Sequence, residues 1–199
     1  SYTNHSVMHT PFKRDIVAEL AASCEKYGLK LGIYLSPWDR HEKSYGKGKE
    51  YDDFFCNQLR ELLTNYGKIY EVWFDGACGE GENGKKQVYD WSRYYNTINE
   101  LQAETVIAIC GPDVRWCGNE AGDTRESEWS VVPSSLFSQK EIEKSSQQKD
   151  GGEFRDLKLT EEEKDLGSRK VVKHAKDLIW YPAEVDVSIR PGWFHHENE

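Results

Sequence analysis

Charged and aromatic side chains stand at the carboxyl ends of the apolar segments of this chain. They are Trp38, Asp39, Arg40 and His41 after residues 29–36, Asp75 in 69–75, Asp113, Arg115, Trp116 and Glu120 after 105–111, Trp129 in 128–132, and Arg190, Trp193, His195 and His196 after 184–189. A charged residue at the end of an apolar strand indicates that this end is solvated or binds a ligand. Carboxylates, guanidinium groups and tryptophan faces together are the equipment for glycosyl transfer to water.

Asp75 is the strongest candidate among these residues for a catalytic carboxylate. It follows the residues VWF, so a rigid strand holds it among aromatic neighbours, and Gly76 leaves room for a ligand to approach. The structural alternative is an aspartate that caps the turn at Gly76. The catalytic interpretation is a carboxylate nucleophile or base, which needs a second carboxyl in a different environment. Spacing does not choose the second group among Asp113, Glu120, Glu126 and Glu128.

Two carboxyl groups at one site are consistent with hydrolysis of a glycosidic bond, and the retaining route is one way in which they act. In that route one carboxylate attacks the anomeric carbon while the other group, about 5–5.5 Å away, protonates the leaving oxygen. Tryptophan faces pack against the C–H face of a sugar. This chemistry requires no metal ion and no organic cofactor, so we expect neither.

Helical and strand periodicities alternate along the first half of the chain. Helices are predicted over residues 11–28, 50–67 and 86–102, and strands over 29–36, 69–75, 105–111, 128–132 and 184–189. The strands are nearly continuous apolar runs, which is typical of parallel βα units. In such folds the chemistry lies at the carboxyl ends of the strands. Residues 138–165 are polar, without a core-facing period, and are predicted to be an insertion or loop.

Composition narrows the function classes further. The chain has 199 residues and a formal net charge of −9, which argues against generic binding of nucleic acid or anionic membranes. No apolar run is long enough to span a membrane. The five cysteines include no CxxC pair, so they predict buried bystanders rather than zinc ligands. Aromatic residues make up 13% of the chain and include seven tryptophans, which suits a sugar site.

Four sequence blocks resemble the α-L-fucosidases of glycoside hydrolase family 29, in that family's order. The blocks are KYGLKLGIYLSPWDRH, YEVWFDGA, GPDVRWCGNEAG with EWSVVP, and WYPAEVDVSIRPGWFHH, and they are spread over residues 26–196 on both sides of 138–165. The resemblance implies a retaining exo-hydrolase with a TIM-like barrel that removes terminal α-L-fucose from fucosylated oligosaccharides or glycoconjugates. The branch it resembles is selective for α-1,3/1,4-linked fucose. The family also suggests a secreted, periplasmic or lysosomal protein.

The resemblance assigns roles by position. Asp75 inherits the nucleophile of the WFDG block, and Glu120 inherits the general acid/base of the GNE-G block. Glu120 must then be protonated near neutral pH while Asp75 is ionised. Glu126 or Glu128 remains an alternative acid. The residues expected to bind or support the sugar are Tyr34, Trp38, Asp39, Arg115, Trp116, Arg190 and Trp193, with Trp193 as a wall for the C6 methyl group.

Other patterns have plainer readings. Tyr34 is alternatively a core residue, and one of His195 and His196 could contact a sugar. Trp91, Tyr94 and Tyr95 have helical spacing and are expected to pack a helix onto the strands.

The sequence also departs from the family pattern. The family's HHDGF-type block, whose histidines contact fucose, does not occur in this chain. A complete barrel needs about 250 residues and eight strands, whereas we count five. The expected fold is therefore an α/β segment of an incomplete (β/α)8 barrel over residues 1–199, which lacks flanking parts of its own full-length chain and part of the sugar pocket.

Two other functions are also compatible with the sequence. The first is a non-catalytic carbohydrate-binding relative of the same fold, although such a protein would not require both carboxylates. The second is a nucleotide-dependent α/β enzyme, because Gly79, Gly81 and Gly84 match GxGxxG. Charged residues fill that loop and no apolar helix follows directly, so an ordinary glycine-rich turn is favoured.

Overall fold

The computed structural model describes residues 2–117, 120, 122–124, 128–136, 138–146, 148–149, 169–187 and 196–198. The chain divides into two compact units. One comprises Ser1–Gly111 with Glu143–Asp150, and the other comprises Pro112–Ile142 with Gly151–Glu199.

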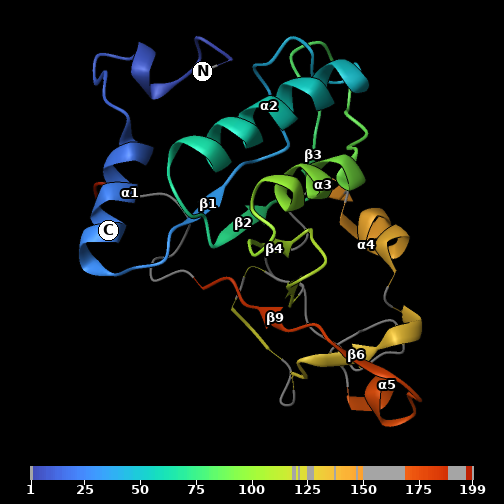
Figure 1. Ribbon diagram of the computed structural model, residues 1–199. Coiled ribbons are helices and arrows are strands. Elements are labelled where there is room, and N and C mark those ends of the chain that lie inside the picture. Colours follow the sequence, from blue (N-terminus) through green and yellow to red (C-terminus); the bar gives the residue numbers. More distant parts are fainter. Residues whose placement is uncertain are drawn as a thin grey trace. The chain divides into compact units, whose positions relative to one another are not determined.

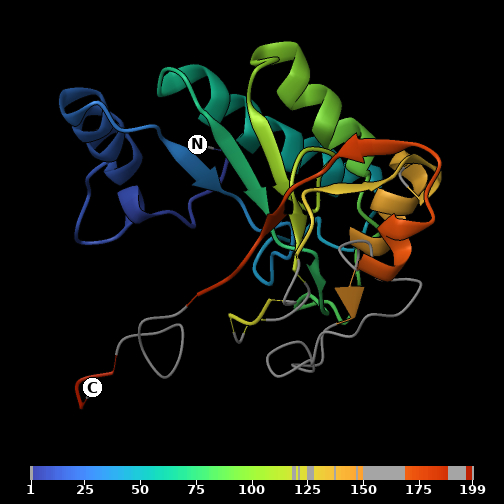
Figure 2. The ribbon, with the colours of Figure 1, turned by 90° about the horizontal axis from the view of Figure 1, so that it is seen from below.

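A three-stranded parallel sheet organises the first unit (Figures 1 and 2). Its order is β1 (Gly32–Tyr34), β2 (Glu71–Phe74) and β4 (Val106–Ile109). Tyr34 lies opposite Trp73, and Phe74 lies opposite Ile109. The carboxyl ends of the three strands therefore meet at one edge of the sheet, as the sequence predicted for these segments.

Three helices accompany these strands: α1 (Ile16–Tyr27), α2 (Lys49–Asn65) and α3 (Trp91–Leu101), after a short 3-10 turn, η1 (Val7–His9). The helix predicted over 86–102 begins five residues later than expected. The side chain of Asp90 accepts a hydrogen bond from the Arg93 amide at 3.1 Å, so Asp90 caps the helix and residues 86–89 precede it.

Aromatic side chains fill the core between α2, α3 and the sheet. Val72 and Phe74 alternate with the less buried Glu71 and Trp73 along β2, so one face of this strand points into the core. The ring of Phe74 lies 5.6 Å from that of Trp91. The prediction that Trp91, Tyr94 and Tyr95 pack α3 onto the strands is confirmed, since all three are buried.

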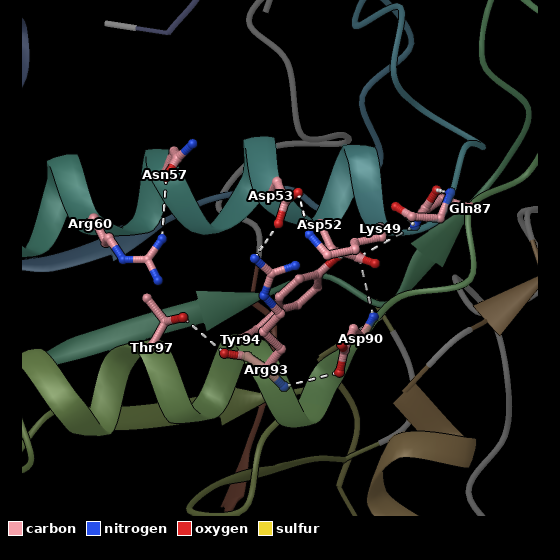
Figure 3. A network of polar contacts seen from close by, with 11 residues as sticks. Lys49, Asp52, Asp53, Asn57, Arg60, Gln87, Asp90, Arg93, Tyr94 and Thr97 are labelled. Carbon is pink, nitrogen blue, oxygen red and sulfur yellow. Dashed lines mark hydrogen bonds and ion pairs between the residues drawn. The ribbon is translucent and has the colours of Figure 1, made fainter.

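A buried polar network joins α2 to α3 (Figure 3). Asp52 is only 5% exposed and accepts hydrogen bonds from the Tyr94 hydroxyl at 2.5 Å, the Gln87 side-chain amide at 3.3 Å and the Asp90 backbone amide at 3.4 Å. Burial raises the pKa of Asp52. Nearby, Arg93 pairs with Asp53 at the surface. These contacts fix the start of α3 against the first turns of α2.

The second unit contains two short strand pairs. β5 (Arg115–Trp116) runs parallel to β9 (Ala183–Glu184), and β6 (Val131–Pro133) runs antiparallel to β8 (Leu178–Trp180). The expectation that the strand near 128–132 is one of five parallel strands is therefore wrong. The observed strand begins at Val131, shortly after residues 128–129, to which Arg115 donates hydrogen bonds. It pairs with β8, a strand that was not predicted from the sequence. Of the predicted strand 184–189, residues 188–189 lie outside the described residues.

Part of the predicted loop 138–165 is ordered. Residues Gln139–Ser146 form α4, in which Ile142 is buried, and β7 (Gln148–Lys149) pairs in parallel with β3 (Ala77–Cys78). A 3-10 turn, η2 (Ser134–Leu136), precedes α4, and a short helix, α5 (Arg169–Lys173), precedes β8. Most of the predicted loop, residues 150–165, lies outside the described residues. The interpretation of 1–199 as one barrel segment stays a prediction.

Candidate active site

Asp75 directly follows β2 and is held by two hydrogen-bond donors. The Tyr34 hydroxyl donates to Asp75 Oδ2 at 2.9 Å, and the Ala77 backbone amide donates to Asp75 Oδ1 at 2.5 Å. Tyr34 ends β1 and lies opposite Trp73, so the parallel register of β1 and β2 brings its ring beside Asp75. The side chain of Asp75 is half-buried. The sequence candidates Tyr34 and Asp75 thus form one site at the strand ends.

Tyr34 is a protonated donor at neutral pH. Desolvation of its hydroxyl, together with the negative charge and hydrogen bond of Asp75, raises the pKa of Tyr34 to about 12. The ring remains 55% exposed and meets Trp73 edge to face at 5.2 Å. Tyr34 is therefore not a core residue among the described residues, and the alternative prediction of a core tyrosine is wrong.

Trp38 packs against the loop that follows Asp75. A Cβ atom added to Gly79 would lie 2.0 Å from Cζ2 of Trp38, so only glycine allows this contact. The indole nitrogen of Trp38 donates to the Glu80 carbonyl at 3.3 Å. The glycine-rich segment is a closed turn in which Gly84 donates to the Gly81 carbonyl at 3.0 Å. No helix starts directly behind this turn, because residues 85–90 are described and α3 begins at Trp91, which speaks against a nucleotide-binding loop.

Asp39 organises its own turn. Its carboxylate accepts hydrogen bonds from the backbone amides of His41 and Glu42, both at 2.8 Å. This is an Asx-type turn, in which the side chain takes the place of a backbone carbonyl. Arg40 lies over the ring of Trp38 at 5.9 Å. We therefore interpret Asp39 as a residue that shapes the loop carrying Trp38.

The end of β4 has an unusual backbone. Ile109 lies opposite Phe74 and has a φ of 68°, which is strained for a β-branched residue. The chain then turns back so closely that a Cβ atom at Gly111 would lie 2.4 Å from the Ile107 carbonyl oxygen. The buried Tyr95 hydroxyl donates to the Cys110 carbonyl at 2.6 Å and anchors this turn. Strain of this kind is found at functional strand ends and is a feature that the sequence pattern did not reveal.

Arg115 lies within a buried ion pair in the second unit. Its side chain donates to Glu128 Oε1 and to the Trp129 carbonyl, both at 2.6 Å, and to the Tyr181 carbonyl at 3.3 Å. The side chains of Arg115 and Glu128 are 8% and 14% exposed. The Glu128 carboxylate is therefore occupied by a structural contact with Arg115. Arg115 supports the backbone here, and the prediction that it binds substrate stays a prediction.

Glu120 lies in the second unit, between two anchored positions. The indole nitrogen of Trp116 donates to Asp186 Oδ2 at 3.0 Å. Gly122 has a φ of 82°, and a Cβ atom there would lie 3.3 Å from the Asp186 carbonyl oxygen. Trp116 and Gly122 thus both lie beside Asp186, and Glu120, which is half-buried, falls between them in the sequence. The pairing of Glu120 with Asp75 stays a prediction.

Several candidates fall outside the described residues, namely Glu126, Arg190, Trp193 and His195. Among the residues that are described, no group of three or more histidine, cysteine, aspartate or glutamate side chains could hold a metal ion. In the same part of the chain, no helix is both long and apolar enough to cross a membrane.

The sequence matches a known family over its first part. A family model described as alpha-L-fucosidase covers residues 1–124, which is more than half of the chain. The chain belongs to the alpha-L-fucosidase family. The resemblance seen in the sequence blocks is therefore confirmed at the level of the family.

Individual members of the alpha-L-fucosidase family align with the whole chain. Alpha-L-fucosidase 1 of Arabidopsis thaliana is 42% identical over 100% of this chain and 35% of its own length. The crystal structure of a Bacteroides ovatus protein assigned to the alpha-L-fucosidases has a TM-score of 0.77 at 51% identity, with 100% of this chain and 33% of that one covered. A glycoside hydrolase 29 family member from a rumen bacterium has a TM-score of 0.74 at 37% identity, with 100% and 34% covered. The chain thus spans about a third of the length of these relatives.

Proposed function

We propose that the complete protein containing this chain is a retaining glycosidase that releases terminal α-L-fucose from oligosaccharides or glycoconjugates. Membership of the alpha-L-fucosidase family supports the sugar and the class of reaction. The main structural support for the mechanism is the position of the Asp75 carboxylate. The Tyr34 hydroxyl and the Ala77 amide hold it at a strand end. A carboxylate fixed in this way presents a defined oxygen to a sugar.

The reaction proceeds in two displacements. In the first, a carboxylate oxygen of Asp75 attacks the anomeric carbon, the bond to the glycosidic oxygen breaks, and Glu120 gives that oxygen a proton. In the second, Glu120 takes a proton from a water molecule that attacks the same carbon, and Asp75 leaves as the free carboxylate. Two inversions leave the anomeric configuration of fucose unchanged.

Tyr34 orients the nucleophile. Its hydroxyl is protonated at neutral pH because its pKa is raised to about 12, so it donates steadily to one oxygen of Asp75. The Ala77 amide engages the other oxygen. The two donors leave the carboxylate only a narrow range of rotation about its side chain, which favours attack along one direction.

Glu120 is preferred to Glu128 as the acid. Glu128 is engaged in an ion pair with the buried Arg115. Glu120 is half-buried, and its described neighbours in the sequence, Trp116 and Gly122, both lie beside Asp186. This contrast supports the assignment that the sequence resemblance implies.

The wider fold and specificity belong to the same proposal. Three parallel strands with α2 and α3 on one side of the sheet correspond to successive βα units of a (β/α)8 barrel (Figure 1). The selectivity for α-1,3/1,4-linked fucose rests on the resemblance of the GNE-G block. We propose a branched, Lewis-type glycan as the natural substrate on that basis.

The stereochemistry of the product tests this function. The complete protein is incubated with an aryl α-L-fucoside, and the first-formed fucose is observed by proton NMR before it mutarotates. We expect the α anomer first, because two displacements retain configuration. The β anomer first would contradict the assignment of Asp75 as a covalent nucleophile. Release of no fucose from either the aryl fucoside or a Lewis-type trisaccharide would overturn the fucosidase function.

A further inference from the structure

The loop after β2 determines where the Asp75 carboxylate points. The Ala77 amide donates to Asp75 Oδ1 at 2.5 Å. A displacement of the Ala77 backbone therefore carries that hydrogen bond with it and turns the carboxylate. What holds Ala77 in place also positions Asp75.

Two buried tyrosines from distant parts of the chain hold this loop. The Tyr89 hydroxyl donates to the Ala77 carbonyl at 2.7 Å, and the Tyr45 hydroxyl donates to the Gly79 carbonyl at 3.1 Å. The two hydroxyl oxygens lie 3.1 Å apart. Tyr45 is 0% exposed and Tyr89 is 5% exposed. Burial raises the pKa of both phenols, so both remain protonated donors.

The segment that carries Tyr89 is itself rigidly anchored. Gln87 is fully buried, and its side-chain oxygen accepts from the amides of Gly46 and Gly48 at 3.0 and 3.1 Å. Its side-chain nitrogen donates to Asp52, which ties it to the network between α2 and α3 (Figure 3). Its carbonyl accepts from the Cys78 thiol at 3.1 Å. The helix network, residues 87–89 and the Asp75 loop are thus one continuous set of contacts.

We infer that Tyr89, assisted by Tyr45, is a positioning residue for Asp75, acting through the backbone of Ala77. The inference rests on the proposed function of Asp75 as nucleophile. Tyr89 is buried beneath the loop and acts on the nucleophile without contacting sugar. Its hydroxyl therefore contributes to the rate of attack and not to the binding of fucose, and loss of the hydroxyl lowers kcat while leaving KM nearly unchanged.

The test replaces single tyrosine hydroxyls in the complete protein and measures turnover of an aryl α-L-fucoside. Tyr89→Phe keeps the ring, which packs edge to face on Trp91 at 5.4 Å, and removes only the donor to Ala77. We expect kcat to fall about 10- to 100-fold, because a carboxylate misplaced by a fraction of an ångström attacks poorly. KM should stay within about two-fold of the wild-type value.

Tyr94→Phe is the matched control. The Tyr94 hydroxyl is also buried and donates to Asp52 at 2.5 Å, within the helix network rather than on the loop. We expect Tyr94→Phe to lower the melting temperature at least as much as Tyr89→Phe while its kcat stays near the wild-type value. Equal losses of kcat in the two variants would show a general effect on stability and overturn the inference.

Two further readouts separate this inference from the proposed function. Asp75→Asn is assayed in parallel: if it is inactive and Tyr89→Phe has wild-type kcat, the function stands and the inference fails. If the wild-type protein releases no fucose, a crystal structure of Tyr89→Phe decides the inference alone. Loss of the contact between the Ala77 amide and Asp75 then supports it, and an unchanged contact contradicts it.

Discussion

Asp75 and Asp52 are two aspartates of the same unit with similar partners and opposite surroundings. Each accepts a hydrogen bond from a tyrosine hydroxyl and another from a backbone amide. Asp52 is 5% exposed between two helices, whereas Asp75 is half-buried at the carboxyl end of a strand. The hydrogen-bond pattern therefore does not distinguish a structural carboxylate from a reactive one. The distinguishing feature is its place in the fold, where a ligand can approach.

The two sites also differ in what their donors achieve. Around Asp52 the hydrogen-bond donors offset part of the cost of burying the carboxylate, although burial still raises the pKa of Asp52. The same hydrogen bonds hold α2 against α3. Around Asp75 the donors leave the carboxylate accessible beside the exposed ring of Tyr34. We expect substitutions at Asp52 to change stability and those at Asp75 to change activity.

The same chemical change at each aspartate gives the largest contrast. Asp75→Asn removes the nucleophile without changing its shape, so we expect activity on an aryl fucoside to fall by about four orders of magnitude or more. The melting temperature should change little. Asp52→Asn should keep most of the wild-type kcat. Comparable losses of activity in the two variants would remove the distinction between the sites.

Truncation of Asp52 should give the largest change in stability. Asp52→Ala leaves the buried Tyr94 hydroxyl without the acceptor that Asp52 provides, so we expect the free energy of unfolding to fall by about 2–4 kcal/mol. Denaturant unfolding of the complete protein measures this. Asp53→Ala is the control, because Asp53 is more exposed and pairs with Lys49 and Arg93 at the surface, where loss of the pairs costs much less. Equal destabilisation by the two changes would contradict a special role for the buried network.

Loss of the Tyr34 hydroxyl should have a smaller effect on catalysis than loss of Asp75. A hydrogen bond to a charged group contributes about 1.5–3 kcal/mol, so Tyr34→Phe should lower kcat about 10- to 100-fold. Tyr66→Phe is a matched control. The Tyr66 hydroxyl donates to Asp15 at 3.0 Å, and its pKa is also raised to about 12, mainly by burial. Unchanged kcat in Tyr34→Phe would show that Asp75 needs no support from β1.

The smallest expected effect is a change in the pH dependence of stability. The pKa of Asp52 is higher in the folded than in the unfolded chain, where it is about 3.9, so the folded state binds more protons in the interval between the two values. The contribution of Asp52 to stability is fully present below the unfolded pKa and decreases as pH rises through this interval. In Asp52→Asn that decrease is absent. The difference in unfolding free energy between variant and wild type should rise with pH above about 4, and a flat difference would contradict the raised pKa.

The sequence predicted the first unit well, because its strands are apolar and its helices amphipathic. Strands near 29–36, 69–75 and 105–111 form the sheet, and Asp75 lies at the strand end where it was expected. The second unit was predicted less well. The strand near 128–132 pairs antiparallel with β8, which the sequence did not predict because its three residues form too short a pattern to recognise.

The support of the candidate site was largely hidden from the sequence. The Ala77 amide and the Ala77 carbonyl belong to the backbone and have no residue signature. Tyr45 and Tyr89 are separated by 44 residues, and neither position follows the period of a helix or strand. In the structure Tyr89 is buried although it lies outside any helix or strand, and this burial indicates that it holds the loop.

Covalent trapping tests the central claim most directly. The complete protein is treated with a 2-deoxy-2-fluoro fucosyl fluoride, which reacts with the nucleophile of a retaining glycosidase and releases the product slowly. Proteolysis and mass spectrometry then locate the fluorofucosyl group. We expect the label on Asp75, in the peptide that contains EVWFDG. A label on Glu120, on Glu128 or on any other carboxylate would contradict it.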